Sequence, residues 1–303
     1  MSRQDINRAF EMTVFVRVVE FEGFTAAAER LNMTPSAVSK LVSRLETRLS
    51  VRLLHRTTRK LQLTPEGRAF YERSLRILDD IDCAEHEAAQ GAAPRGRVRI
   101  NSHVAFGVHY LLPLLPDFMA RYPEVGLDVA LSDAVVDLLD DRSDVAIRTG
   151  PLQDSLLVLR RLGASRMAVV ATPSYLQREG VPKKPEELTE RNLLSFAYAR
   201  HVESWHFKGR KGAVAITPTG KLRLGDGESM RQMVMAGAGI ARLARFHVDD
   251  DIRAGRLVPL LESYNPGDTE EIHAVFIGPG KQVPARVRVL LDFLADKVHI
   301  RVT

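Results

Sequence analysis

The sequence of 303 residues predicts a small N-terminal domain rich in α-helix, followed by a larger α/β region of two doubly wound subdomains. Apolar residues in the first sixty positions recur at helical spacing. A single long helical pattern over residues 65–90 then ends in a segment containing Gly and Pro. From Val98 onward, short apolar runs alternate with helix-length segments, an order typical of parallel sheets.

Composition argues against several classes of protein. Hydrophobic residues make up 45% of the chain, and there is no uncharged apolar run of the length, about eighteen residues, that a membrane span needs. The polar start lacks the apolar core of a signal peptide, so we expect a cytoplasmic protein. The single cysteine, Cys83, excludes an internal disulfide and a cysteine-based zinc site. We expect no metal and no cofactor.

The basic residues are concentrated in one part of the chain. The net charge is only +5, yet the stretch from residue 30 to residue 60 holds eight basic residues against one acid, Glu46. These basic residues are Arg30, Lys40, Arg44, Arg48, Arg52, Arg56, Arg59 and Lys60. Such a patch is expected of a protein that binds DNA phosphates. The alternative is an ordinary solvated face.

The pattern of this stretch favours DNA binding. We expect three helices, over residues 7–21, 26–31 and 35–48. Thr25 is the expected cap of the second helix. Thr34 is a good N-cap for the third helix, and Pro35 suits its first position, where a missing N–H costs nothing.

The third helix has two separate faces. Its apolar positions follow helical spacing and should be buried: Val38, Leu41, Val42 and Leu45. The other face carries short hydroxyls and cations without an acid, which suits a helix in the major groove. We predict DNA contacts from its first turns and outer face: Thr34, Pro35, Ser36, Ser39, Lys40, Ser43 and Arg44.

A β-hairpin wing should follow this helix. Two short apolar runs between Leu49 and Leu63 flank a basic turn, a pattern typical of a hairpin. Its tip would reach the DNA backbone or minor groove through Arg56, Thr57, Arg59 and Lys60. The predicted DNA-binding domain is therefore a winged helix-turn-helix over residues 1–64.

The long helix over residues 65–90 is predicted to dimerise. Tyr71, Leu75, Leu78 and Ile81 recur at spacings of four and three, as in a coiled coil. The alternative is a helix that packs only on its own domain. A dimer suits DNA, because a protein twofold axis presents two recognition helices to two half-sites.

The region 95–303 should form two α/β subdomains, one from about 95–163 and 269–303, the other from about 164–268. We expect strands near 98–100, 127–131, 145–147, 167–171, 193–198 and 274–277, a hairpin at 205–222, and helices at 173–179, 228–237 and 284–297. The βαβ order predicts parallel sheets. Trp205 should pack at the surface of the hairpin.

A cleft between two such subdomains is the expected place for a small-molecule effector. Ligands of α/β folds bind at the carboxyl ends of strands and at helix N-termini. Applied to this sequence, that rule points to the loops at 101–103, 148–150, 197–198 and 226–228. Within them we predict seven effector contacts: Asn101, Ser102, His103, Thr149, Tyr198, Asp226 and Gly227.

Three segments of the N-terminal part resemble the DNA-binding motif of LysR-type transcriptional regulators. They are Ala26–Glu46 (AAAERLNMTPSAVSKLVSRLE), Leu53–Arg59 (LLHRTTR) and Leu63–Gly67 (LTPEG). The family often has Gln where Pro35 stands. The resemblance implies a DNA-binding regulator that dimerises through its linker helix, often forms tetramers, and binds interrupted palindromic operators.

The C-terminal part resembles the effector domain of the same family, which is itself similar to periplasmic solute-binding proteins. The matching segments are Asp144–Arg148, Ala171–Leu176 and Ala236–Ala241. Two alternatives stay open: a DNA-architectural protein without an effector, and a solute-binding receptor. The nucleophile-elbow, zincin and P-loop motifs are absent from the sequence, so we expect the protein not to be an enzyme.

Overall fold

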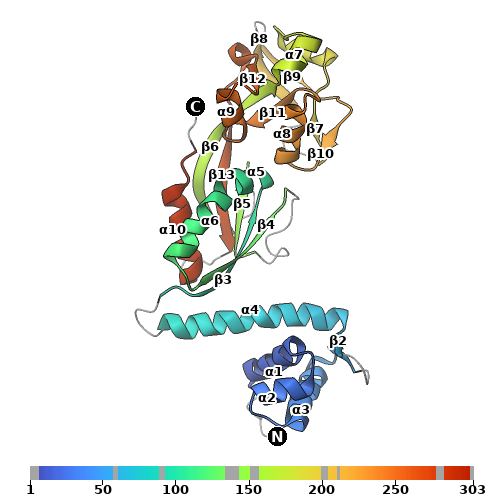
Figure 1. Ribbon diagram of the computed structural model, residues 1–303, viewed down its shortest axis with the longest axis vertical. Coiled ribbons are helices and arrows are strands. Elements are labelled where there is room, and N and C mark those ends of the chain that lie inside the picture. The colour runs from blue at the N-terminus through green and yellow to red at the C-terminus, as the bar shows by residue number, and fades with distance from the viewer. Residues whose placement is uncertain are drawn as a thin grey trace. The chain divides into compact units, whose positions relative to one another are not determined.

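The computed structural model describes residues 7–56, 61–88, 93–133, 143–150, 157–198, 204–209, 212–277 and 283–300. The chain divides into two compact units, Met1–Ala92 and Ala93–Thr303 (Figure 1). Among the described helices, none combines the length and apolar character that crossing a membrane requires.

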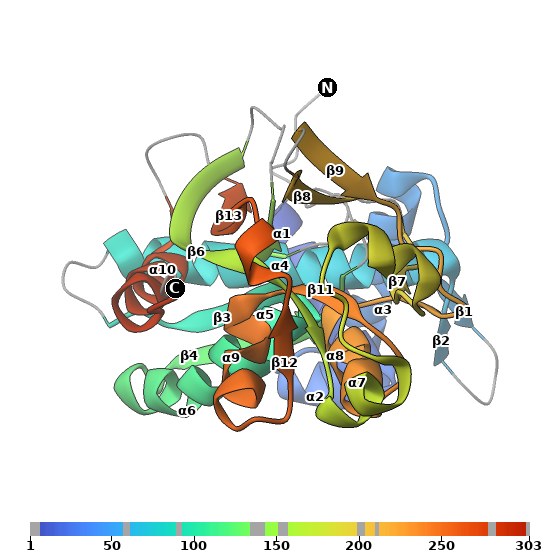
Figure 2. The same ribbon diagram turned by 90° about the horizontal axis from the view of Figure 1, so that it is seen from above.

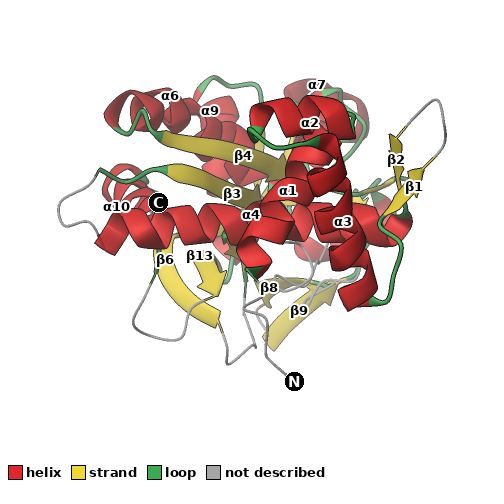
Figure 3. Cartoon of the chain, turned by 90° about the horizontal axis from the view of Figure 1, so that it is seen from below, coloured by secondary structure: helices red, strands yellow, loops and turns green. Residues whose placement is uncertain are grey.

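The first unit is a three-helix domain with a two-stranded wing and a long final helix. Its elements are α1 (Arg8–Glu20), α2 (Phe24–Arg30), α3 (Pro35–Leu49), β1 (Leu54–Arg56), β2 (Leu61–Leu63) and α4 (Pro65–Ala88). The two wing strands pair antiparallel (Figure 3). The three expected helices are present, but the expected cap at Thr25 is wrong: α2 begins at Phe24 with Gly23 as its N-cap, which places Thr25 inside the helix.

Helix α4 is anchored to the first unit by its N-terminal turns. The hydroxyl of Thr64 accepts a hydrogen bond from the N–H of Gly67 at 2.8 Å. The rings of Phe70 and Tyr71 pack on Phe15, with centroids 5.6 Å and 6.5 Å away. Tyr71, expected in a dimer seam, therefore contacts its own domain. This apolar packing fixes the first turns of α4 against α1.

The second unit is built on one seven-stranded mixed sheet with the strand order β11-β6-β13-β5-β3-β4, in which β12 also pairs with β6. Its strands are β3 (Gly96–Ser102), β4 (Val125–Leu131), β5 (Val145–Thr149), β6 (Leu157–Ala171), β11 (Ala241–Ala244), β12 (Val258–Leu260) and β13 (Thr269–Ile277). Strand β3 is parallel to β4 and β5, as expected from the βαβ order (Figure 1).

The remaining elements of this unit cover the sheet and extend one end of it. The helical segments are α5 (Val104–Phe106), the π-helical η1 (Gly107–Leu111), α6 (Leu112–Arg121), α7 (Pro173–Glu179), η2 (Pro185–Glu190), α8 (Gly227–Met235), α9 (Arg245–Arg253), η3 (Glu262–Tyr264) and α10 (Ala285–Lys297). The smaller sheets pair β7 (Ser195–Phe196) with β10 (Arg223–Leu224), and β8 (Trp205–Gly209) with β9 (Gly212–Ile216).

One long strand, β6, runs through both halves of the unit. The N-terminal part of β6 pairs with β13, and its C-terminal part pairs with β11 and β12. Helices α6 and α10 lie at one end, and α7 and α8 at the other, with β6 between them (Figures 1 and 2). We call the half with β3, β4, β5, α5, η1, α6 and α10 subdomain I, and the half with α7, α8, α9, β11 and β12 subdomain II.

The expectation of a parallel sheet in the second subdomain is wrong for the strands that pair with β6. Strands β11 and β12 both pair antiparallel with β6. The expected strand at 193–198 is reduced to β7, which lies outside this sheet and pairs parallel with β10. Apolar runs show where strands lie but carry no information on their direction, so parallel and antiparallel pairing could not be distinguished from the apolar pattern.

Each subdomain has its own core. In subdomain I the ring of Phe118 from α6 meets Phe293 from α10, edge to face, with centroids 5.3 Å apart. In subdomain II the core includes Trp205, which is only 7% exposed. The expectation of a surface Trp205 is therefore wrong, because β8 and β9 fold back and bury the indole against that core.

Candidate functional site

Helix α3 separates an apolar face from a polar one, as the sequence predicts. Val38, Val42 and Leu45 are fully buried, and Leu41 is partly buried. The hydroxyl of Thr34 caps the helix by accepting the N–H of Ala37 at 3.3 Å. On the opposite side, the residues predicted to contact DNA are exposed or half-buried: Thr34, Pro35, Ser36, Ser39, Lys40, Ser43 and Arg44.

Two acids of this domain, Glu11 and Glu46, are buried rather than exposed on α3. Glu11 of α1 is fully buried, and its carboxylate accepts hydrogen bonds from Arg44 at 2.5 Å and Arg48 at 2.9 Å. Glu46 is 5% exposed and accepts the backbone N–H groups of Leu53 and Leu54. The carboxylates thus hold the domain together without placing negative charge on the polar face of α3.

The role of Glu11 could not be seen in the sequence. It lies 33 residues from Arg44, on another helix, where it interrupts an otherwise apolar face. Arg44 is therefore exposed on α3 and at the same time ion-paired with a buried carboxylate. Lys40 is exposed on the same helix.

Part of the predicted wing lies outside the described residues. The strand pairing joins Leu54 to Leu63 and Arg56 to Leu61, so the two strands of the expected hairpin are present. The backbone of Arg56 belongs to β1, but nothing is described of its side chain. Thr57, Arg59 and Lys60 fall outside the described residues.

In the second unit, four of the seven predicted effector residues line one pocket between the subdomains. His103 and Thr149 come from subdomain I, and Tyr198 and Gly227 lie on the other side. Asp133, Phe246 and other side chains complete the lining. The free volume is about 40 Å³, room for about one water molecule, whose share of liquid volume is about 30 Å³.

The other three predicted residues support the pocket from outside it. Asn101 is 3% exposed, and its side-chain oxygen accepts a hydrogen bond from Arg148 at 2.7 Å. Ser102 is buried and donates to the carbonyl of His103. Asp226 caps α8 by accepting the N–H of Ser229 at 2.8 Å. None of the three is among the residues that line the pocket.

Asp133 joins the two subdomains at this pocket. One carboxylate oxygen accepts the N–H of Val104 at 2.8 Å, and the other accepts the N–H of Gly227 at 3.2 Å. Burial alone would raise the pKa of Asp133, but the hydrogen bond and charge of His103 and the two N–H groups outweigh it, so the pKa is lowered. Asp133 lies two residues after the end of β4, yet no local pattern distinguished it from other loop acids.

A second cavity lies next to the first. Its volume is about 300 Å³, which reaches the lower end of the range for small-molecule pockets, about 300–1,000 Å³. Phe196 and Tyr198 line both cavities. Trp205, Arg223 and Arg242 contribute to its wall, so apolar surface and cations are both present.

The fold and these surfaces define a class of protein: a winged helix-turn-helix domain joined to an α/β domain of two subdomains with pockets between and beside them. The chain belongs to the LysR family of transcriptional regulators. Residues 11–68 match the family described as "Bacterial regulatory helix-turn-helix protein, lysR family", and residues 91–298 match the "LysR substrate binding domain". The identification made from the sequence motifs is confirmed.

Known relatives agree over nearly the whole chain. The transcriptional regulator CrgA of Neisseria meningitidis is 40% identical over 290 residues, which cover 95% of this chain and 96% of CrgA. The transcriptional activator AaeR of Escherichia coli is 35% identical, covering 96% and 94%. The solved structure of CrgA, with 38% identity, matches with a TM-score of 0.65 over 96% of this chain and 99% of that one.

Proposed function

We propose that this LysR-type regulator binds specific DNA through α3 and the wing, and that a small molecule bound between the subdomains of its second unit modulates this binding. One observation carries the DNA-binding part: α3 exposes Ser36, Lys40 and Arg44 while Glu11 and Glu46 are buried. Cations and hydroxyls on one helix face are the groups that contact phosphates and base edges. Such a function belongs in the bacterial cytoplasm, where the DNA is.

The expected target is an interrupted palindrome read by a dimer or a pair of dimers. Beyond the turns that pack on Phe15, α4 keeps Leu75, Leu78 and Ile81 only partly buried, and Ile77 is 42% exposed. An apolar stripe at coiled-coil spacing supports pairing with a second α4. Two α3 helices related by a twofold axis would then read two half-sites.

The effector site is proposed at the pocket of His103, Thr149, Tyr198 and Gly227. At about 40 Å³ this pocket is too small for a metabolite while the subdomains are arranged as in this structure, which we call the closed arrangement. Binding therefore requires the subdomains to part or the pocket to merge with the 300 Å³ cavity across Phe196 and Tyr198. A ligand that favours one arrangement would change DNA binding by a coupling free energy of about 1–3 kcal/mol.

The DNA-binding part is tested by electrophoretic retardation of the DNA upstream of the protein's own gene. We expect retardation at low salt that weakens steeply as salt increases, and footprints over two half-sites. Absence of retardation at low salt would refute the proposal and favour a solute-binding receptor.

The effector part is tested separately by thermal denaturation in a panel of metabolites. A ligand of the folded state raises the melting temperature by mass action. His103→Ala should abolish the shift given by any active compound while leaving DNA retardation in its absence intact. DNA binding with no stabilising compound would favour the DNA-architectural alternative.

A further inference from the structure

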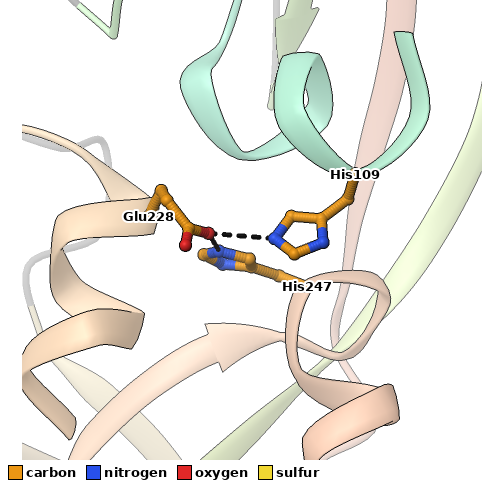
Figure 4. Close-up of side chains that lie close together, drawn as sticks. All are labelled: His109, Glu228 and His247. Atoms are coloured by element: carbon orange, nitrogen blue, oxygen red, sulfur yellow. Dashed lines mark hydrogen bonds and ion pairs between the residues drawn. The ribbon is translucent and has the colours of Figure 1, made fainter. Parts of the chain in front are cut away.

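Two histidines and a glutamate from three different elements meet beside the cleft. His109 comes from η1, Glu228 from α8 and His247 from α9 (Figure 4). The Nε2 atoms of both imidazoles lie 2.9 Å from the same carboxylate oxygen, Oε2 of Glu228. The three atoms offered by these side chains all lie within 4.8 Å of one another. Their polar atoms thus converge on one point.

The chemistry of this set suits a transition metal. Two imidazole nitrogens and one carboxylate oxygen form a ligand set used by catalytic zinc sites, which leave a fourth position open. Magnesium and calcium prefer oxygen ligands throughout, so two nitrogens out of three favour zinc and its neighbours.

The surrounding side chains hold Glu228 in place for such a role. Its other oxygen, Oε1, accepts hydrogen bonds from Arg231 at 3.0 Å and Gln232 at 2.7 Å. That arrangement leaves Oε2 directed at the imidazoles, as an outer shell does for a metal-ligating carboxylate. The positive charge of Arg231 is balanced by buried Asp251, whose carboxylate lies 2.6 Å away.

Burial of the cluster is graded. The side chain of His247 is 3% exposed, that of Glu228 17% and that of His109 25%. A metal ion would therefore be shielded on the side of subdomain II and reachable from the side of His109. His247 also lines the cleft pocket, so the cluster adjoins the proposed effector site.

We propose that His109, Glu228 and His247 bind a divalent transition metal of the zinc type, which links subdomain I to subdomain II. His109 belongs to subdomain I and the other two ligands to subdomain II, so a bound metal holds the closed arrangement together. The sequence contained no signal for this site, because the ligands lie 119 and 19 residues from Glu228 and form no spacing motif. This inference goes beyond the proposed regulatory function and departs from the expectation of no metal.

Direct metal binding provides the test. Tag-free, full-length protein is freed of metal with a chelator and titrated with zinc by calorimetry, and with cobalt by visible absorption. We expect one equivalent of zinc per chain and the absorption of four-coordinate cobalt. His109→Ala and Glu228→Gln should each weaken zinc binding by at least about tenfold, the smaller of the losses known for outer-shell changes.

A matched control comes from His206, an exposed histidine in β8 remote in sequence from the cluster. His206→Ala should bind zinc as the unaltered protein does, and circular dichroism should show that every variant is folded. Absence of saturable zinc binding, or equal affinity in His109→Ala and His206→Ala, would overturn the proposal. The cluster would then be a hydrogen-bonded network in which both imidazoles donate to Glu228.

The link between subdomains has its own readout. Zinc should raise the melting temperature of the unaltered protein and of His206→Ala, because it binds the folded state. It should raise the melting temperature of His109→Ala by less, since that variant keeps Glu228 and His247 but loses the ligand from subdomain I. These measurements need no DNA, so failure of the metal site and failure of the DNA-binding proposal are distinguishable.

Discussion

Arg44 donates from Nε to the buried carboxylate of Glu11, with the two atoms 2.5 Å apart. Arg48 binds the other oxygen of the same carboxylate at 2.9 Å. Two cations of α3 are thereby fastened to α1, which fixes the orientation of α3 in the domain. Arg44 thus has a structural role besides its proposed contact with DNA. Among the described residues, Lys40 of the same helix is exposed and shows no comparable ion pair with a buried carboxylate.

This difference predicts that Lys40→Ala and Arg44→Ala behave differently. Lys40→Ala should weaken DNA binding by about 1–3 kcal/mol and, if its contact is to a phosphate, reduce the salt slope by about 1, with stability unchanged. Arg44→Ala should weaken DNA binding and also lower stability. Retardation assays at several salt concentrations and thermal melts followed by circular dichroism measure both quantities. Unaltered binding by Lys40→Ala would show that this residue faces away from DNA.

A second prediction concerns Gly67 of α4, which lies against the backbone of Leu53, the residue before β1. A Cβ added there would lie 1.9 Å from the carbonyl oxygen of Leu53, a backbone atom that cannot move aside. Gly67→Ala should therefore destabilise the first unit by about 1–3 kcal/mol, as overpacking commonly does.

The two units can be followed separately in this experiment. The single tryptophan, Trp205, is buried in the second unit, so its fluorescence reports that unit alone. Gly67→Ala should shift the transition seen by circular dichroism but leave the fluorescence transition in place. Gly225→Ala, where an added methyl group meets open space, is the control. Equal melting of both variants would contradict the steric argument.

A third prediction concerns Asp133 and the closed cleft. Its two oxygens accept the N–H groups of Val104 and Gly227, one from each subdomain. Asp133→Asn replaces one acceptor with a donor, which leaves one of these N–H groups unsatisfied. The second unit should lose about 1–3 kcal/mol of stability, measured by urea denaturation with Trp205 fluorescence. A loss no larger than that of Asp128→Asn, an exposed acid of β4, would show that the closing contact is weak.

A fourth prediction concerns acid stability. Burial alone would raise the pKa of Asp251, but hydrogen bonds from Arg231 and Arg256 outweigh it, and the pKa is lowered. The stability that ionised Asp251 contributes is thus fully present above the pKa of an Asp in the unfolded state, about 3.9. It is lost as the pH falls through the pKa of Asp251 in the folded state. Urea denaturation monitored by Trp205 should show stability falling below about pH 4, and falling less steeply in Asp251→Asn. Parallel pH profiles would contradict this assignment.

The sequence by itself determined the helix-turn-helix. Helical spacing buries Val38, Val42 and Leu45, and Thr34 with Pro35 begins the helix, all through interactions within a few residues of each other. The order of strands and helices predicted the α/β class for the same reason, since periodicity is a local property. Four residues of the cleft pocket followed from the rule that ligands meet strand ends and helix starts.

Only the tertiary structure decided what depends on distant residues meeting. Strand direction in subdomain II, the burial of Trp205 and the pairing of Glu11 with Arg44 arise from packing between segments far apart in the chain. Asp133 and Glu228 gain their roles the same way, because each carboxylate collects donors from both subdomains. Hydrogen bonds and burial act through space, so residues without a shared local pattern become one site only when the chain has folded.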